Sequence, residues 1–475
     1  MNPIVTENRI TFKEMEEKIF AYVCEVGVEM TRHMLESYDR ELHAGRDTKK
    51  YRDKGARTTT IKTVYGDVAY QRKVYQTTDE EGRTAFVYLL DEAVHMDKIG
   101  LISTSLAEKI ASCVTGNPYR VTAGIITGTT GQAISHGGVW KLVQKLGARV
   151  SGEEEAQAKQ MEAGTLRGER EVKVLFEEMD GVWLKMQGEG HKKMPKQEMK
   201  VSTTYEGWEE KGGGLCGKKV FAGMEKAQGF HAKREAQIEA AYNVDETEYR
   251  VLNGDGGGWI KDPYFPDVVF QLDRFHIRRE IKRKLNQDKE AAKAVEGLFA
   301  AGEMDRMLEY IKTYADSVDT GQEGDKRAEK ARGLHQYLKN NYEGLLPYRE
   351  RGIKFPAPPE GMRYGNMGVQ ENQNCTVITM RMKGDRKRWS ESGANNMAKL
   401  LYRKENKELA STVGRYAEAL AFNIQMTEII TVLSAAKAPK KDGKGSPYIE
   451  RINMHVPLRD AIQTASVKAF EKALL

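Results

Sequence analysis

Three acidic residues stand where carboxylates could hold metal ions. Asp180 ends the strand candidate VKVLFEEMD, Asp255 ends the strand candidate YRVLNGD, and Glu371 lies on a later helix candidate. Carboxylates on rigid elements suit Mg²⁺, a hard cation that prefers oxygen ligands. Two such ions about 3.5–4 Å apart can activate a water or a 3′-hydroxyl and stabilise charge at a phosphodiester. We therefore expect a two-metal site for phosphoryl transfer on DNA, in which Mn²⁺ could replace Mg²⁺.

Each of these acids also has an ordinary structural explanation. Asp180-Gly181 fits a type I′ hairpin turn, since Asp-Gly favours that turn. Asp255 could belong to a glycine-rich loop, and Glu371 could be a solvated helix residue. Glu391, in the stretch WSESGA, is the alternative third acid. Two acids that end strands and a third on a helix together favour the metal site.

The elements that must position the acids follow residue 170. Between the first two acids lie the strand candidates MKVSTTYEGWEE and KKVFAGM and a helix at about 230–242, and DVVFQLD follows Asp255. The order β-β-β-α-β-β predicts a mixed sheet with helices on its faces. Residues 171–275 would form the first part of this α/β core, 276–355 a charged helical insertion, and 356–435 the rest with the glutamate helix.

The remaining segments change character several times. Amphipathic spacing predicts one long helix from about 10 to 45, and alternation around Tyr65-Gly66-Asp67 predicts a small β-hairpin. Helix, turn and helix patterns then outline a helix-turn-helix whose last helix is capped by Ser135. We expect these segments: a helical segment at 1–56, a β unit at 57–95, a DNA-binding domain at 96–150, a linker at 151–170, and a basic linker with a C-terminal helix at 436–475.

Basic side chains near these elements are candidates for DNA contacts. Contacts to phosphates give affinity that depends on salt, whereas side chains in the major groove read sequence. The alternative is that each run is a solvated helix face. The backbone candidates are Arg278, Arg279, Lys282 and Arg283 after the last strand, and Lys383 after the glutamate helix. The sequence-reading candidates on the helix-turn-helix are His136, Lys141, Gln144 and Lys145.

The stretches around the second and third acids resemble a known family. VLNGDG, FPD and QLDRFH are similar to the second-aspartate region of Mutator-like transposases, and GVQEN followed by RMKG and WS is similar to their glutamate helix. The chain resembles above all the insertion-sequence transposases of the ISL type, long catalogued as an uncharacterised protein family. The resemblance implies a ribonuclease-H-like core, a metal triad of Asp180, Asp255 and Glu371, and a site shaped by Asp273 and His276.

The function that follows is that of a DDE-type transposase, which cleaves DNA at the ends of a mobile element and transfers the strands into target DNA. Its partners would be double-stranded DNA, including terminal inverted repeats, and further copies of the chain in a dimer or larger assembly. One alternative is a nuclease of the same fold that does not join strands. Another is a non-catalytic DNA-binding protein derived from a transposase.

Composition is consistent with this function and disfavours several others. The net charge of +6 over 475 residues permits a nucleic-acid partner. The four cysteines are far apart, so no zinc pair is expected. The glycine-rich stretch that includes Asp255 fits neither GxGxxG nor a phosphate-binding loop ending in Gly-Lys-Ser/Thr, and the run Gly212-Gly213-Gly214 lies in a polar loop, which together argue against a nucleotide cofactor. With no signal-peptide pattern and no apolar run of about 20 residues, we expect a cytoplasmic, nucleoid-associated bacterial protein.

Overall fold

The computed structural model describes residues 11–94, 102–261, 268–319, 326–384 and 386–414. The chain divides into two compact units. Of the described residues, the smaller unit contains 11–94, 102–103 and 129–133, and the larger contains 104–128, 134–261, 268–319, 326–384 and 386–414. The predicted core segment 356–435 is described only as far as Gly414, and the predictions for 436–475 lie outside the described residues. Within the described ranges, every helix is too short or too polar to span a bilayer.

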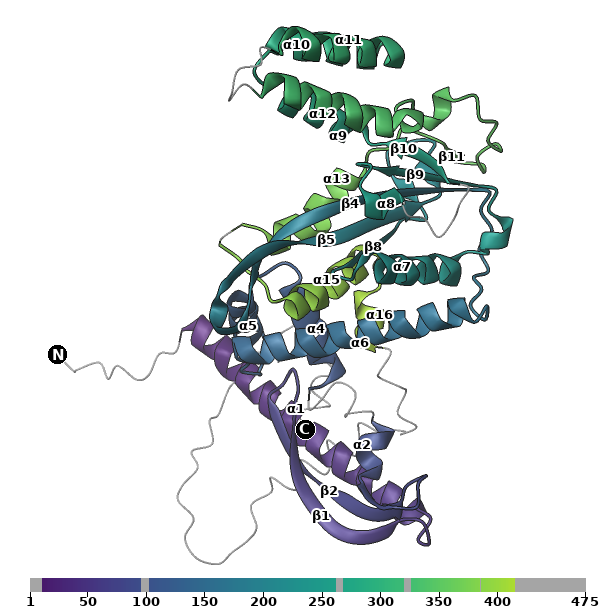
Figure 1. Cartoon of the computed structure of the whole chain (residues 1–475). Helices are drawn as coiled ribbons and strands as arrows, with labels where there is room; N and C mark the ends of the chain where they lie inside the picture. Colours follow the sequence, from purple (N-terminus) through teal and green to yellow (C-terminus); the bar gives the residue numbers. More distant parts are fainter. Residues whose placement is uncertain (1–10, 95–101, 262–267, 320–325, 385, 415–475) are drawn as a thin grey trace, which may run out of the picture. The chain divides into compact units, whose positions relative to one another are not determined.

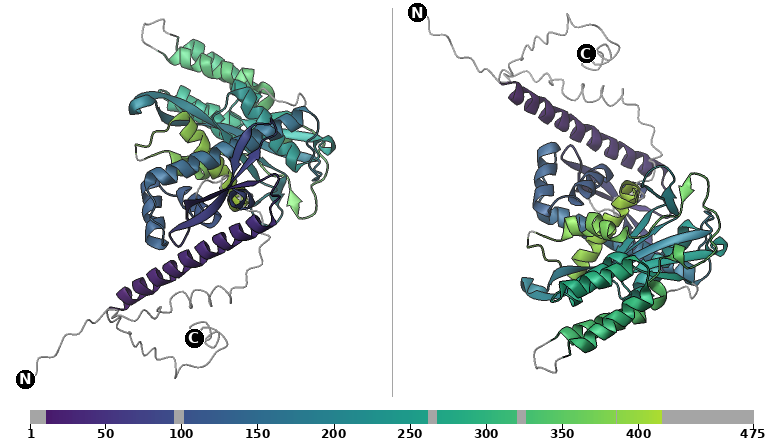
Figure 2. Two further views of the ribbon diagram at one scale, coloured as in Figure 1. Left: turned by 90° about the horizontal axis from the view of Figure 1, so that it is seen from below. Right: turned by 90° about the horizontal axis from the view of Figure 1, so that it is seen from above.

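The smaller unit packs one long helix against a three-stranded antiparallel sheet. Thr11 and Glu14 form a capping box at the start of the helix, which runs unbroken past Gly27 (Figure 2). Ile61, Val68 and other apolar side chains of the hairpin pack under this helix. The elements are α1 (Phe12–Gly45), β1 (Arg52–Lys62), β2 (Asp67–Thr78), β3 (Thr84–Val87) and α2 (Leu89–Ala93). The predicted helix and hairpin are confirmed.

The larger unit contains a five-stranded mixed sheet (Figure 1). Its strand order is β10-β9-β4-β5-β8, in which β5 is antiparallel to its neighbours β4 and β8, and β4, β9 and β10 run parallel. The strands are β4 (Val174–Gln187), β5 (Lys193–Tyr205), β8 (Lys219–Gly223), β9 (Tyr249–Gly254) and β10 (Val269–Leu272). With helix α7 (Ala227–Ala241) between β8 and β9, the predicted order β-β-β-α-β-β is confirmed.

Helices before the sheet belong to this same unit. They are α4 (Thr104–Val114), α5 (Tyr119–Thr129) and α6 (His136–Glu162). Ser135 caps α6 as expected, and the helix continues to Glu162, into the segment at 151–170 that we expected to be a helical linker. Its later turns pack against α7 and against α15 (Glu391–Glu405). The helices of the predicted DNA-binding domain are therefore part of the larger unit and not a separate compact body.

The predicted helical insertion follows β10 and has its own core. Its helices are α9 (Arg274–Lys284), α10 (Lys289–Ala300), α11 (Met304–Ser317) and α12 (Arg327–Asn340). Ile277, Val295, Phe299 and Ile311 are among the apolar side chains that they bury together. Because β10 contributes Leu272 to this core, the insertion is anchored directly to the sheet.

Short elements complete the larger unit. A second sheet has the order β11-β6-β7, with β6 (Gly207–Glu209), β7 (Leu215–Cys216) and β11 (Met362–Arg363). The glutamate helix is built from α13 (Gln370–Gln373), the π-helical turn η5 (Asn374–Thr379) and α14 (Met380–Met382). The remaining helices are α8 (Gly258–Lys261), α16 (Leu409–Gly414) and the 3₁₀ turns Glu189–His191, Val244–Glu246, Tyr342–Gly344 and Tyr348–Glu350.

Candidate metal centre

Asp180 lies within a strand, which differs from its predicted position at a strand end. Strand β4 continues to Gln187, and Asp180 pairs with Val201 of β5. On its other side, however, the parallel neighbour β9 ends at Gly254, opposite Met179. Asp255, which follows β9 directly, is thereby brought level with Asp180. The hairpin-turn explanation of Asp180-Gly181 is wrong, because β4 passes straight through it.

Three side chains converge at this edge. Ligand atoms of Asp180, Asp255 and His276 all lie within 4.8 Å of one another. The imidazole Nε2 of His276 is 3.7 Å from Asp180 Oδ1, and it is buried with no hydrogen-bond partner among the described residues. Two carboxylates and an available nitrogen are a donor set that fits a divalent cation, and the nitrogen favours Mn²⁺ over Mg²⁺.

His276 is held in place by the residue that starts its helix. Asp273 caps α9, and its Oδ1 accepts hydrogen bonds of 3.0 Å from both the backbone N–H and the Nδ1 of His276. Burial lowers the pKa of His276, but the bond to Asp273 and the nearby Asp180 outweigh it, so the pKa is raised. Because Nδ1–H is donated to Asp273, Nε2 is turned toward the acids. Carboxylates outside the ligand shell of metal sites commonly orient a histidine in this way.

Glu371 reaches the same cleft from helix α13. The cleft has a volume of about 380 Å³ and is open to solvent, and Asp180, Asp255 and Glu371 all line it. Glu391 is exposed in the first turn of α15 and is not among the lining residues. The three predicted acids thus line one cleft, although Glu371 is exposed and does not belong to the group within 4.8 Å, and the alternative third acid lies outside the cleft.

The helix of Glu371 is anchored by a residue that sequence reasoning missed. Glu178 is fully buried on β4, on the same strand face as Asp180. A carboxylate that accepts backbone N–H groups at a helix start is stabilised by them and by the helix dipole. Its donors are the N–H groups of Gly368, Val369 and Gln370 at 2.9–3.2 Å, the Tyr205 hydroxyl at 2.6 Å and Asn253 Nδ2 at 3.0 Å. Its only sequence signal was a glutamate inside an apolar strand.

The glutamate helix also contacts Asp180 directly. Asn374 donates from Nδ2 to Asp180 Oδ2 at 2.7 Å, and Gln370 donates to the Asn374 side chain at 2.8 Å. Asn374 opens the π-helical turn, and such turns often occur at functional sites. This contact fixes one oxygen of Asp180 and leaves the other facing His276.

Asp180 is a buried acid whose neighbours do not fully offset the cost of burying its charge. Burial raises the pKa of Asp180 to about 6, opposed by His276 and the Gly181 N–H and reinforced by Asp255 and Glu371. Glu198 of β5, a fourth acid that sequence reasoning missed, also lines the cleft. Burial raises its pKa as well, and Asp255 adds to the effect. A Cβ on Gly181 would collide with the Glu198 carboxylate, which explains the glycine next to Asp180.

The predicted DNA-contact residues divide into those at the cleft and those away from it. Arg279 and Lys383 line the cleft beside the acids. Arg278, Lys282 and Arg283 are exposed on α9, where Arg283 pairs with Glu280. On α6, His136, Lys141 and Lys145 are exposed. Gln144, by contrast, accepts a bond of 2.7 Å from Asn396 of α15 and is used in packing within the unit.

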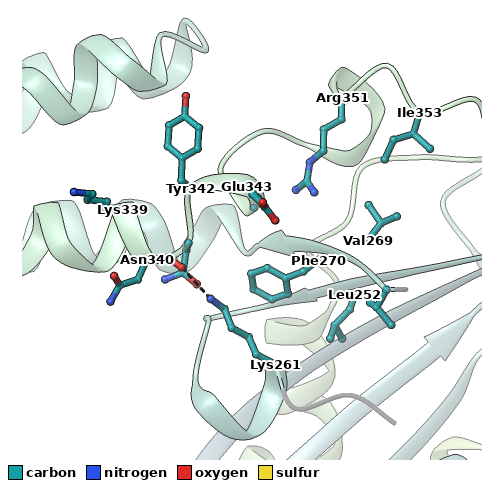
Figure 3. Close-up of a pocket in the computed structure, with 13 residues that line it drawn as sticks. Leu252, Lys261, Val269, Phe270, Lys339, Asn340, Tyr342, Glu343, Arg351 and Ile353 are labelled. Carbon is teal, nitrogen blue, oxygen red and sulfur yellow. Dashed lines mark hydrogen bonds between the residues drawn. The ribbon is translucent and has the colours of Figure 1, made fainter. Parts of the chain in front are cut away.

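A larger cavity lies beside strand β10 and the insertion and has a different character. It has a volume of about 710 Å³, and Phe270, Leu252 and Val269 form apolar parts of its wall (Figure 3). Glu343 is the one carboxylate among its described lining residues, alongside the basic Lys261, Lys339 and Arg351. A lone carboxylate among cations does not form a divalent-metal site, so the acid-lined cleft is the candidate centre.

These observations define the class of protein: an α/β protein whose mixed sheet carries an acid-lined cleft. The chain belongs to UPF0236, an uncharacterised protein family whose model matches residues 5–415. It is 24% identical over 402 residues to the UPF0236 protein in the vanSb 3′ region of Streptococcus gallolyticus, with 83% of each chain covered.

Two further comparisons are more distant or more partial. A UPF0236 protein of Caldanaerobacter subterraneus subsp. tengcongensis, whose name joins eleven loci, is 23% identical over 400 residues, covering 83% of this chain and 78% of the relative. Among solved structures, the Drosophila P element transposase strand transfer complex is similar at 10% identity and a TM-score of 0.21, covering 73% of this chain and 90% of that one.

Proposed function

We propose that the chain is a DDE-type DNA transposase of a bacterial insertion sequence, built on a ribonuclease-H-like core. The observation that carries the proposal is the convergence of Asp180, Asp255 and Glu371 on one open cleft, with the phosphate-binding candidates Arg279 and Lys383 at its wall. Acids and cations side by side suit a site that holds metal ions and a DNA phosphate together.

Two observations support the finer parts of the proposal. Three antiparallel strands, a helix and two strands parallel to the first are the arrangement that a ribonuclease-H-like core requires. In addition, one relative has a name that joins eleven loci of a single strain, and a gene found at many loci in one genome is typical of a mobile element.

The roles of the side chains follow from their positions. Asp180, Asp255 and Glu371 would hold two Mg²⁺ or Mn²⁺ ions, with His276 orienting Asp180 or adding its nitrogen. When bound, such ions activate the attacking oxygen and stabilise charge at the phosphate. Arg279 and Lys383 would bind the DNA backbone. Synapsis of two element ends would need a dimer or larger assembly on the DNA of the bacterial cytoplasm.

The test is cleavage of linear DNA that carries the element's own ends, with Mg²⁺ or Mn²⁺. Wild type should nick at the ends, Asp255→Asn and Glu371→Gln should lose nicking, and Glu391→Gln should keep it. If Glu391→Gln loses nicking while Glu371→Gln keeps it, the third ligand is Glu391 on α15 and not Glu371.

The same reaction separates the alternatives. Joining of the cut ends to a target plasmid would distinguish a transposase from a nuclease of the same fold. Binding of the ends without cleavage, under either metal, would overturn the enzymatic proposal and leave a DNA-binding protein.

A further inference from the structure

A second groove in the larger unit is lined by aromatic and basic side chains. It has a volume of about 310 Å³, and no carboxylate occurs among its described lining residues. It differs from the metal cleft, with which it shares no lining residue. The side chains that matter for its chemistry are Tyr119, Trp140, Trp389, Arg381, Lys387 and Arg388.

Arg381 is the unusual member of this set. Only 5% of it is exposed, and its guanidinium lies 5.6 Å from the ring centre of Tyr119 and 5.5 Å from that of Trp389. Its Nε donates to the backbone oxygen of Val114 at 2.7 Å, but its Nη2 is buried with no hydrogen-bond partner among the described residues. A buried guanidinium N–H without an acceptor is costly, which points to an acceptor supplied by a ligand.

The aromatic residues offer a flat surface beside this cation. Trp140 projects from α6 with 45% of its surface exposed, although most large aromatic side chains of this unit are buried. Trp389 is fixed by a bond of 2.9 Å from its Nε1 to the Met382 oxygen, and it meets Tyr119 edge to face. An exposed indole and a guanidinium that line one groove are the groups that can stack an unpaired base and bind its phosphate.

We propose that this groove binds an unpaired nucleotide of a DNA strand, with the base on Trp140 and the phosphate at Arg381, Lys387 and Arg388. The inference rests on the proposed function and deepens it. The groove is too small for a duplex but suits one nucleotide. Its Arg381 stands two residues from Lys383, which lines the metal cleft, so a strand leaving the cleft could enter the groove.

The test measures binding by the full chain in EDTA, where no metal-dependent cleavage occurs. The probes are a labelled ten-nucleotide single strand and a blunt twenty-base-pair duplex. Because stacking of one base contributes about 1–3 kcal/mol, Trp140→Ala should weaken single-strand binding by about tenfold. Duplex binding should change by less than about twofold. Tyr310→Ala, which removes a partly exposed aromatic of α11, is the matched control and should change neither.

A second measurement reports stacking directly. A 2-aminopurine at the unpaired position of an element end should be quenched by wild type and not by Trp140→Ala. Arg381→Lys, checked for folding by its melting temperature, should weaken single-strand binding while keeping the charge, because it removes the planar fork. Equal weakening of both probes in Trp140→Ala, no weakening of either, or tighter binding of free dTMP than of the strand would overturn the proposal.

The outcome is separable from that of the proposed function. A wild type that quenches 2-aminopurine but never cuts DNA would refute the transposase and keep the groove as a single-strand site. A wild type that cuts and joins DNA while Trp140→Ala behaves like wild type would refute the groove alone.

Discussion

Two carboxylates three residues apart on β4 lie in opposite electrostatic surroundings. Glu177 faces α7 and forms ion pairs with Arg234 and Arg250, which also pair with Glu235. Burial raises the pKa of Glu177, but the two guanidinium groups outweigh it and the pKa is lowered. Asp180 faces the cleft, where burial and further acids raise its pKa.

The difference separates a carboxylate that stabilises the fold from one that is available for chemistry. A buried charge with its counter-charges present needs no ligand, and removing one partner destabilises the protein. A buried carboxylate with further acids nearby, as Asp180 is, is favourable mainly when it binds a cation or a proton. We therefore expect the two sides of β4 to have different roles, and four predictions test this contrast.

The largest effect is expected on activity. Asp180→Asn should lower DNA cleavage by about 10³-fold or more, because a ligand for the metal ions is lost. The folded state should be as stable as wild type or more stable, since the variant removes a charge that burial disfavours. Cleavage assays and urea titrations check the two halves. A variant that cuts DNA normally, or that fails to fold, would contradict the contrast.

The opposite carboxylate should affect stability. Glu177→Gln should lower the free energy of unfolding by about 3–5 kcal/mol, because Arg234 and Arg250 lose a buried counter-charge. Glu246→Gln, which removes an exposed pair with Lys173, is the control and should cost about 0–1 kcal/mol. Urea titration measures both, and equal losses would remove the distinction between the buried and the exposed carboxylates.

The pH dependence of the two sites should have opposite signs. In the metal-free protein, Asp180 has a raised pKa of about 6, so its protonated form is favoured and its contribution to stability is lost as pH rises from about 4 to 6. That loss is about 3 kcal/mol for a shift of about two pH units. The lowered pKa of Glu177 acts in reverse, and its contribution is lost as pH falls below about 4.5.

The free energy of unfolding between about pH 2 and 7 measures this difference. The stability of Asp180→Asn relative to wild type should increase as pH rises. The stability of Glu177→Gln should approach that of wild type as pH falls. Glu391→Gln, at an exposed position of the same unit, should run parallel to wild type. Parallel curves for all three variants would show that the two carboxylates do not differ.

The smallest effect concerns the residue that orients Asp180. Asn374→Ala removes the donor at 2.7 Å from Asp180 Oδ2 and should lower cleavage by about tenfold, as loss of an outer-sphere partner commonly does. The stability change should stay near 1 kcal/mol. Asn372→Ala, an exposed neighbour on the same helix, should leave cleavage unchanged. An effect of Asn374→Ala as large as that of Asp180→Asn would make Asn374 a ligand itself.

The elements of the larger unit were predictable because their patterns are local. Alternation and apolar runs defined β4, β5, β8, β9 and β10, and helical spacing defined the insertion. The convergence of Asp180 and Asp255 was also foreseen, since both follow or lie in neighbouring strands. Asp180 was nonetheless expected at a strand end, because no local sequence pattern shows that β4 continues beyond the end of its parallel neighbour β9.

The sequence by itself determined the order of the elements, the three candidate acids and the family that the chain resembles. Only the tertiary structure decided that Glu371 and not Glu391 lines the cleft. It also decided that Glu178 holds the start of the glutamate helix and that Asn374 holds Asp180. It also decided that Gln144 packs against α15. The physical reason is that these contacts join residues far apart in the chain. The energy of each charge depends on how far burial removes water from it and on which neighbouring groups compensate it, and only the folded structure fixes both.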